Sequence, residues 1–224
     1  MTSSQAILGF SVVALLLTLL PGIDSALIVR SAVSFSRRYA WMVALGILSG
    51  TLVWGIAASV GATALLATSE IAYRLLSVAG ALYLGWMGVR LCIRSFRQAR
   101  GPEAPAADAD GTGGIMPATA AHDSLWRGFA LGLITNLLNP KVGVFYLAVI
   151  PQFMPPGMSP IVMGTALALV HNLWSLVWFA ILIVAGNALG KRLRSPKFLR
   201  WLDRVTGGVL VAFGIGLLFE LRTT

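Results

Sequence analysis

The chain alternates long apolar stretches with short polar ones, and six of the apolar stretches are long enough to cross a bilayer. A helix rises about 1.5 Å per residue, so about 20 apolar residues span the roughly 30 Å hydrocarbon core. The six stretches cover residues 6–29, 40–67, 71–92, 128–150, 160–186 and 205–221. We therefore predict an all-α integral membrane protein with six transmembrane helices.

Two of these stretches are interrupted by helix-breaking and charged residues. The first contains Leu20-Pro21-Gly22-Ile23-Asp24, and the fourth contains Asn136-Leu137-Leu138-Asn139-Pro140-Lys141. A proline or glycine frees backbone groups that lipid cannot satisfy but a polar cavity can. A charge near the bilayer centre costs about 2.5–3.5 kcal/mol and usually marks the path of an ion or a substrate. The pattern therefore predicts broken helices in spans one and four, and it favours a transporter.

Composition and charge agree with a chain that spans a membrane. Hydrophobic residues make up 57% of the chain and charged residues only 11%. The net charge of +9 does not indicate a nucleic-acid partner, because the basic residues gather in the odd-numbered connections between stretches, apart from Arg74, Lys141 and Arg222. Basic connections stay cytoplasmic, so both termini are predicted to lie outside.

Residues 99–123 are rich in Pro, Gly, Ala and Asp and have little to bury, which predicts a flexible cytoplasmic linker. The linker separates residues 1–98 from residues 124–224, and each part contains three stretches. An odd number of spans gives the two halves opposite orientations, as in an inverted repeat. The predicted fold is therefore two inverted three-helix repeats, with broken helices one and four at corresponding positions around a central site.

Asp24 is the one acidic residue that lies well inside an apolar stretch. Its carboxyl group could hold a substrate ammonium group or a transported proton, because burial in a low-dielectric cavity favours the protonated form. Pro21 and Gly22 would line the same site. The structural alternative is that Asp24 caps the helix that restarts after Gly22, or pairs with Arg30.

The matching element in span four is Asn139-Pro140-Lys141. Asn136 and Asn139 could satisfy the backbone that Pro140 frees, or they could line a cavity. Lys141 could hold a carboxylate, helped by the positive end of the half-helix that begins there. The alternative is an ion pair between Lys141 and Asp24 without substrate contact.

His171 and Asn172 lie in the middle of the fifth stretch. Asn172 is a candidate for substrate contact, and His171 either relays protons or makes a single interhelical hydrogen bond. With 2 histidines and 1 cysteine, the chain has too few ligands for a transition-metal cluster. It contains no phosphate loop, nucleophile elbow or metalloprotease motif in a plausible context, so we predict neither an enzyme nor a bound cofactor.

The chain resembles the lysine exporter (LysE/RhtB) family of amino-acid exporters along nearly its whole length. The resemblance is carried by the first break, by Gly80-Ala81-Leu82-Tyr83-Leu84-Gly85-Trp86, and most specifically by Gly128-Phe129 followed by residues 136–141 and Pro151-Gln152-Phe153. The chain departs from the family at Ile23, where a second proline is common, and at Thr51, where an acid is common. The resemblance implies proton-coupled efflux of an amino acid or a close derivative, in a bacterial plasma membrane.

We therefore predict a secondary transporter that holds its substrate between spans one and four, with lipid, protons and an amino acid as partners and a homo-oligomer left open. The candidate substrate-binding residues are Pro21, Gly22, Asp24, Asn136, Asn139, Pro140, Lys141 and Asn172, and those for proton coupling are Asp24 and His171. The alternatives are an exporter of another small solute, such as a divalent metal ion, and a non-catalytic membrane adaptor.

Overall fold

The structure, a computed structural model, consists of helices joined by short connections in the residues it describes, which are 2–20, 22–97, 124–155, 157–193 and 196–223. In chain order these are α1 (Ser3–Leu19), α2 (Ile23–Ser34), α3 (Arg37–Thr68), α4 (Glu70–Arg97), α5 (Leu125–Leu137), α6 (Pro140–Val149), the 3₁₀ helix η2 (Ile150–Phe153), α7 (Pro160–Leu193) and α8 (Pro196–Thr223). The predicted linker, residues 99–123, lies outside the described residues.

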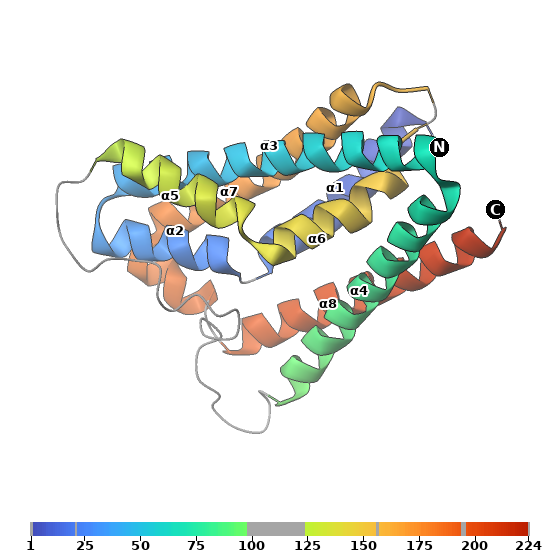
Figure 1. The fold of residues 1–224 in the computed structure, drawn as a ribbon. Helices are drawn as coiled ribbons and strands as arrows, with labels where there is room; N and C mark the ends of the chain where they lie inside the picture. The colour runs from blue at the N-terminus through green and yellow to red at the C-terminus, as the bar shows by residue number, and fades with distance from the viewer. Residues whose placement is uncertain (1, 21, 98–123, 156, 194–195, 224) are drawn as a thin grey trace.

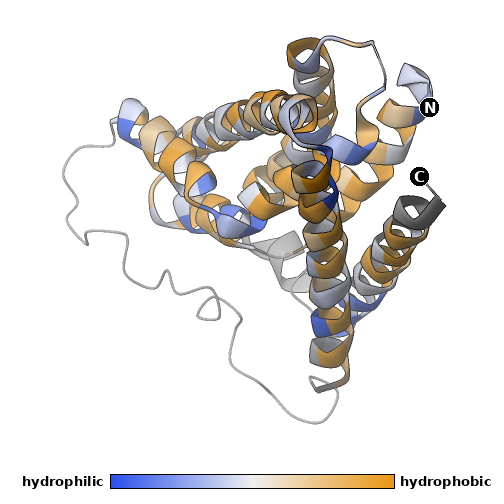
Figure 2. Ribbon diagram, turned by 45° about the vertical axis from the view of Figure 1, so that its right-hand side comes forward, coloured by the Kyte–Doolittle hydropathy of each residue, from blue (hydrophilic) through white to orange (hydrophobic). Residues whose placement is uncertain are grey.

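Five of the six predicted spans correspond to elements that are long and apolar enough to cross a membrane. Within the described residues, α3, α4 and α7 are each long and apolar enough to cross a membrane alone. The bent pairs α1–α2 and α5–α6 are long and apolar enough when each pair forms one span. The sixth predicted span, residues 205–221, is continuous helix within α8 but is not among these five. Apolar residues predominate along the helices (Figure 2). The all-helical membrane architecture is thus supported, and the count of six spans stays a prediction.

Both predicted helix breaks are present. The axes of α1 and α2 are bent by 52° where they meet, and those of α5 and the segment from α6 to η2 are bent by 55°. Each half of the chain therefore has the same order, a broken pair followed by two long helices. α1 begins and α8 ends at the same end of the molecule, near the junction of α3 and α4 (Figure 1). This order is what two inverted repeats need, although the symmetry between the halves stays a prediction.

Glycines set the closest contacts between helices. A Cβ atom added to Gly46 of α3 would collide with the Phe129 carbonyl of α5, and one added to Gly132 would collide with the backbone of α3. In the pair α4–α8, a Cβ atom on Gly88 or on Gly207 would lie 2.6 Å from the carbonyl oxygen of the other. Figure 1 shows α4 and α8 side by side, oblique to the remaining helices. Such close backbone approach is how helices associate in lipid.

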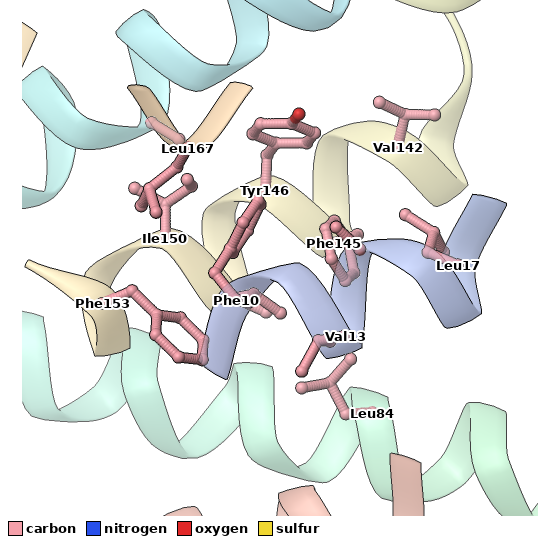
Figure 3. Close-up of a cluster of buried hydrophobic side chains, with 14 of the residues drawn as sticks. Phe10, Val13, Leu17, Leu84, Val142, Phe145, Tyr146, Ile150, Phe153 and Leu167 are labelled. Atoms are coloured by element: carbon pink, nitrogen blue, oxygen red, sulfur yellow. The ribbon is translucent and has the colours of Figure 1, made fainter. Parts of the chain in front are cut away.

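Aromatic rings pack the first half of span one against the second half of span four. The ring centroid of Phe10 in α1 lies 6.3 Å from that of Phe145 in α6 and 5.7 Å from that of Phe153 in η2. Phe153 in turn stacks on Phe213 of α8 at 5.8 Å. Figure 3 shows the rings of Phe10, Phe145 and Phe153 close together, with Tyr146 projecting away from α1. This packing fixes the position of the two helix breaks relative to each other.

Candidate functional site

At the break in span four, the backbone carbonyl that loses its helical hydrogen-bond donor is bonded by a nearby amide and by one indole. Pro140 lacks the amide hydrogen that would bond the Asn136 carbonyl four residues earlier. That carbonyl instead accepts from the Asn139 amide at 3.1 Å and from the Trp54 indole nitrogen at 3.4 Å. The Asn139 side chain caps α6, because its Oδ1 accepts from the Lys141 amide at 3.1 Å. The break therefore needs no water or lipid partner at the Asn136 carbonyl.

The break in span one lies against Lys141. α2 begins at Ile23, directly after Gly22, which has an extended backbone and makes no side-chain cap. A Cβ atom on Gly22 would lie 3.2 Å from Nζ of Lys141, so glycine lets the ammonium group approach the backbone at this point. The two breaks thus meet in the centre of the bundle. Pro21, one of the candidate residues, lies outside the described residues.

Both carboxylate oxygens of Asp24 accept hydrogen bonds from span four. Asn136 donates through Nδ2 to Oδ2 at 3.0 Å, and Asn139 donates through Nδ2 to Oδ1 at 3.3 Å. Lys141 is close enough to interact electrostatically with the same carboxyl group. Arg30, the alternative partner, is exposed on α2. Two amide donors and a nearby cation together stabilise a negative charge that hydrocarbon would not tolerate.

A small cleft opens at the junction of the two broken spans. Asp24 and Lys141 are the acidic and basic side chains among its described lining residues. The rest of its polar lining is Thr18, Ser25, Thr51, Asn136, Asn139, His171 and Ser175, and its apolar wall is Leu17, Leu20, Ile23, Ile47, Val142 and Phe179. The cleft therefore offers one negative and one positive group beside an apolar wall.

Two tryptophans of α7 hold both halves of span one. The Trp174 indole nitrogen donates to the Ser11 hydroxyl oxygen of α1 at 2.9 Å. The Trp178 indole nitrogen donates to the Ser25 hydroxyl oxygen of α2 at 3.2 Å. A buried indole N–H needs such an acceptor, so these bonds link the long helix α7 to both sides of the break.

His171 reaches the cleft from α7 while its imidazole is bonded to α6. Its Nδ1 lies 2.8 Å from the Tyr146 hydroxyl oxygen, and the two rings stack with centroids 5.7 Å apart. Both side chains are buried. This contact is the interhelical hydrogen bond that the sequence offered as the alternative to a proton relay. The relay itself stays a prediction.

The structure brings most, but not all, of the candidate residues to the cleft. Those that line it are Gly22, Asp24, Asn136, Asn139, Lys141 and His171. Pro140 and Asn172 are not among its lining residues. Pro140 is the exposed first residue of α6, and the Asn172 side chain donates to the Leu48 carbonyl of α3 at 3.0 Å.

Sequence reasoning missed the hydroxyl groups in the cleft. Thr18 of α1 and Ser175 of α7 line it with their hydroxyl oxygens 3.4 Å apart. Ser175 lies one helical turn after His171, which was the signal available. That signal is weak, because serine and threonine inside apolar helices commonly bond to the carbonyl four residues earlier, as Thr18 does to Ala14 at 2.9 Å.

Comparison with known proteins identifies the family. The family model described as LysE type translocator matches residues 15–221, so the chain belongs to this family. The threonine efflux proteins of Salmonella typhi and Escherichia coli (strain K12) are each 29% identical to it, over 89% of this chain and 91% of their own length. The leucine efflux protein of Enterobacter sp. (strain 638) is 24% identical over 88% of this chain and 87% of its own. No solved structure matches the chain significantly. The resemblance seen in the sequence is thereby confirmed, and it indicates a transporter rather than an enzyme.

Proposed function

We propose, from the premise that the chain belongs to the LysE type translocator family, that it exports amino acids without net charge in exchange for protons. Threonine and leucine, which the names of its relatives give as the solutes of efflux, are both of this class. The observation that supports the proposal is that Asp24 and Lys141 line one cleft where two broken spans meet. An amino acid carries the complementary pair, an ammonium group for Asp24 and a carboxylate for Lys141.

The charges of the cleft favour a neutral substrate over a basic or acidic one. Any additional charge on the substrate would find no further acidic or basic side chain among the described lining residues, and an unpaired buried charge is strongly disfavoured. Thr51, which lines the cleft, stands where the family commonly has an acid. A divalent metal ion is disfavoured too, because the Lys141 cation lies beside the carboxylate that would bind it.

Proton exchange follows from competition for one carboxylate. Asp24 can hold either the substrate ammonium group or a proton, so protonation from outside would release the substrate and departure of the proton inside would restore the site. Movement of one half of the molecule against the other would then expose the cleft to each side in turn. With both termini outside, as the basic residues predict, Asp24 would lie on the cytoplasmic side of the bilayer midplane.

Counterflow of labelled L-threonine in proteoliposomes tests this function. We expect unlabelled L-threonine in the lumen to drive uptake of the label, and an acidic lumen alone to drive it too. Asp24→Asn should abolish both, because an amide neither titrates nor balances an ammonium group. Glu70→Gln is the matched control, since Glu70 is an exposed acid that pairs with Arg74 at 2.8 Å, away from the cleft.

Each part of the proposal can fail separately in this assay. If the wild-type protein shows no counterflow of L-threonine or L-leucine, the proposed transport of neutral amino acids is wrong. If counterflow occurs but an acidic lumen drives no uptake, the proton exchange is wrong. If L-lysine competes as well as L-threonine, the charge argument for the substrate class is wrong.

A further inference from the structure

We propose that the Nε2–H group of His171 binds the substrate carboxylate, and that Tyr146 is a positioning residue that fixes the imidazole tautomer needed for this. The inference rests on the proposed function and adds a second donor beside Lys141. It gives the Tyr146–His171 contact a role that differs from the proton relay predicted for His171.

The tautomer follows from satisfying the buried tyrosine. The Tyr146 hydroxyl is fully buried, and His171 Nδ1, at 2.8 Å, is its hydrogen-bond partner among the described residues. If Nδ1 carried the proton, the hydroxyl would accept that bond and its own O–H would be buried without an acceptor, which is unfavourable by about 1–3 kcal/mol. The hydroxyl therefore donates to Nδ1, and a neutral imidazole must then carry its proton on Nε2.

The second ring nitrogen is the one available to a ligand. Nδ1 is engaged with Tyr146 on α6, whereas His171 as a residue lines the cleft. Nε2 lies on the far side of the ring from the tyrosine bond, so it is the polar atom that the imidazole can present there. Ser175, one turn along α7, lines the same cleft.

His171 and Lys141 act on the same region of the cleft. The Lys141 ammonium group is close enough to interact electrostatically with the imidazole, as it also is with Asp24. Both residues line the same cleft, so a carboxylate held there by Lys141 can turn its second oxygen toward the imidazole. A neutral N–H donor adds a hydrogen bond to the carboxylate without adding a second positive charge to the site.

The imidazole is also held rigidly, which a binding group requires. The Tyr146 ring stacks against it with an interplanar angle of 25°, and the Phe145 ring packs on it with centroids 6.1 Å apart. Tyr146 is itself packed against α3, because a Cβ atom on Gly55 would lie 3.4 Å from its ring. Preorganised donors bind more tightly than mobile ones, since less freedom is lost on binding.

Nitrogen NMR of the imidazole tests the tautomer and the contact directly. The chain has 2 histidines, so the variant His122→Ala, labelled with ¹⁵N-histidine, leaves His171 as the single imidazole signal. At neutral pH we expect an unprotonated, hydrogen-bonded Nδ1 and a protonated Nε2. Saturating L-threonine should shift the Nε2 resonance, whereas L-threoninamide, which lacks the carboxylate, should leave it in place. A protonated Nδ1, or an equal shift with both compounds, would overturn the proposal.

Transport by variants gives the second readout. His171→Phe should raise the half-saturation concentration of L-threonine roughly tenfold or more, because a hydrogen bond to a charged group is lost. His171→Gln keeps an N–H donor near the Nε2 position and should recover part of the affinity. Tyr146→Phe should lose the hydrogen-bonded Nδ1 signal and bind L-threonine more weakly, with little change in maximal rate. Tyr73→Phe is the control, since it removes a tyrosine hydrogen bond of 3.2 Å to the Pro151 carbonyl, and neither residue lines the cleft.

The outcomes separate this inference from the proposed function. If the wild-type protein transports L-threonine but His171→Phe has the wild-type half-saturation concentration, His171 does not bind the carboxylate and the transport function stands. If the half-saturation concentration of L-threonine is as high for His171→Gln as for His171→Phe, the assignment of His171 as a hydrogen-bond donor is wrong. If His171→Phe does not fold, the NMR of His122→Ala still decides the question. An absence of counterflow in the wild-type protein refutes the proposed function itself.

Discussion

Replacing Gly50 by alanine should weaken substrate binding, because the new methyl group would displace Asn136. The added Cβ atom would lie 2.6 Å from Oδ1 of Asn136 and 3.1 Å from its Cβ and Cγ atoms. Ordinary van der Waals contact begins at 3.4 Å, so the Asn136 amide must move by roughly 0.8 Å. The same amide donates the 3.0 Å hydrogen bond to Asp24, and a shift of this size away from Asp24 would break it.

The magnitude follows from the loss of that hydrogen bond. A hydrogen bond to a charged group contributes about 1.5–3 kcal/mol, and each 1.4 kcal/mol is about a factor of ten in an equilibrium constant. The Asp24 anion, which the substrate ammonium group needs, would be less stabilised by that amount. We therefore expect the half-saturation concentration of L-threonine to rise roughly tenfold to a hundredfold.

The assay is counterflow in proteoliposomes at varied L-threonine concentration, with equal amounts of reconstituted protein. Gly61→Ala is the matched control, because Gly61 lies in the same helix α3 and a Cβ atom there would meet nothing within 4 Å. A wild-type half-saturation concentration for Gly50→Ala would refute the role assigned to Asn136. An equal loss in Gly61→Ala would show that the effect belongs to the helix backbone and not to the site.

Two further predictions concern orientation and packing. A cysteine introduced by Asp108→Cys in a Cys92→Ala background should resist an impermeant thiol reagent in intact cells, because the basic residues predict that residues 99–123 are inside; rapid labelling from outside would reverse the orientation. Gly207→Val should destabilise the folded protein in a thermal unfolding assay by about 1–3 kcal/mol or more, since even its Cβ atom would lie 2.6 Å from the Gly88 carbonyl oxygen. Gly208→Val, with nothing within 4 Å of the added Cβ atom, should be tolerated, and an equal loss in both variants would contradict this packing.

The sequence predicted the helix breaks well because their causes are local. Proline removes an amide hydrogen wherever it stands, and Asn139 before Pro140 is a typical cap at the start of a helix. The structure has α6 beginning at Pro140 with that cap in place. A single charge inside an apolar stretch is likewise visible without a fold, which is why Asp24 and Lys141 could be selected as candidates.

The partners of these residues could not be read from the sequence, because they depend on how distant helices are rotated and packed. Asn136 is 112 residues from Asp24 along the chain, and no local pattern indicates that its amide points there. His171 and Asn172 are neighbours in sequence but about 100° apart around α7. One therefore faces the cleft and the other bonds to Leu48 of α3, although the sequence made both of them candidates.

The most direct test of the central claim, that Asp24 and Lys141 hold the two ends of a zwitterion, is L-threonine counterflow by the double variant Asp24→Asn/Lys141→Met. Removing both charges together avoids leaving one of them buried without compensation, so the protein should still fold and reach the membrane. We predict normal expression of the double variant and no counterflow. Counterflow at the wild-type rate would contradict the claim, and it would show that the two residues are a structural pair without contact to the substrate.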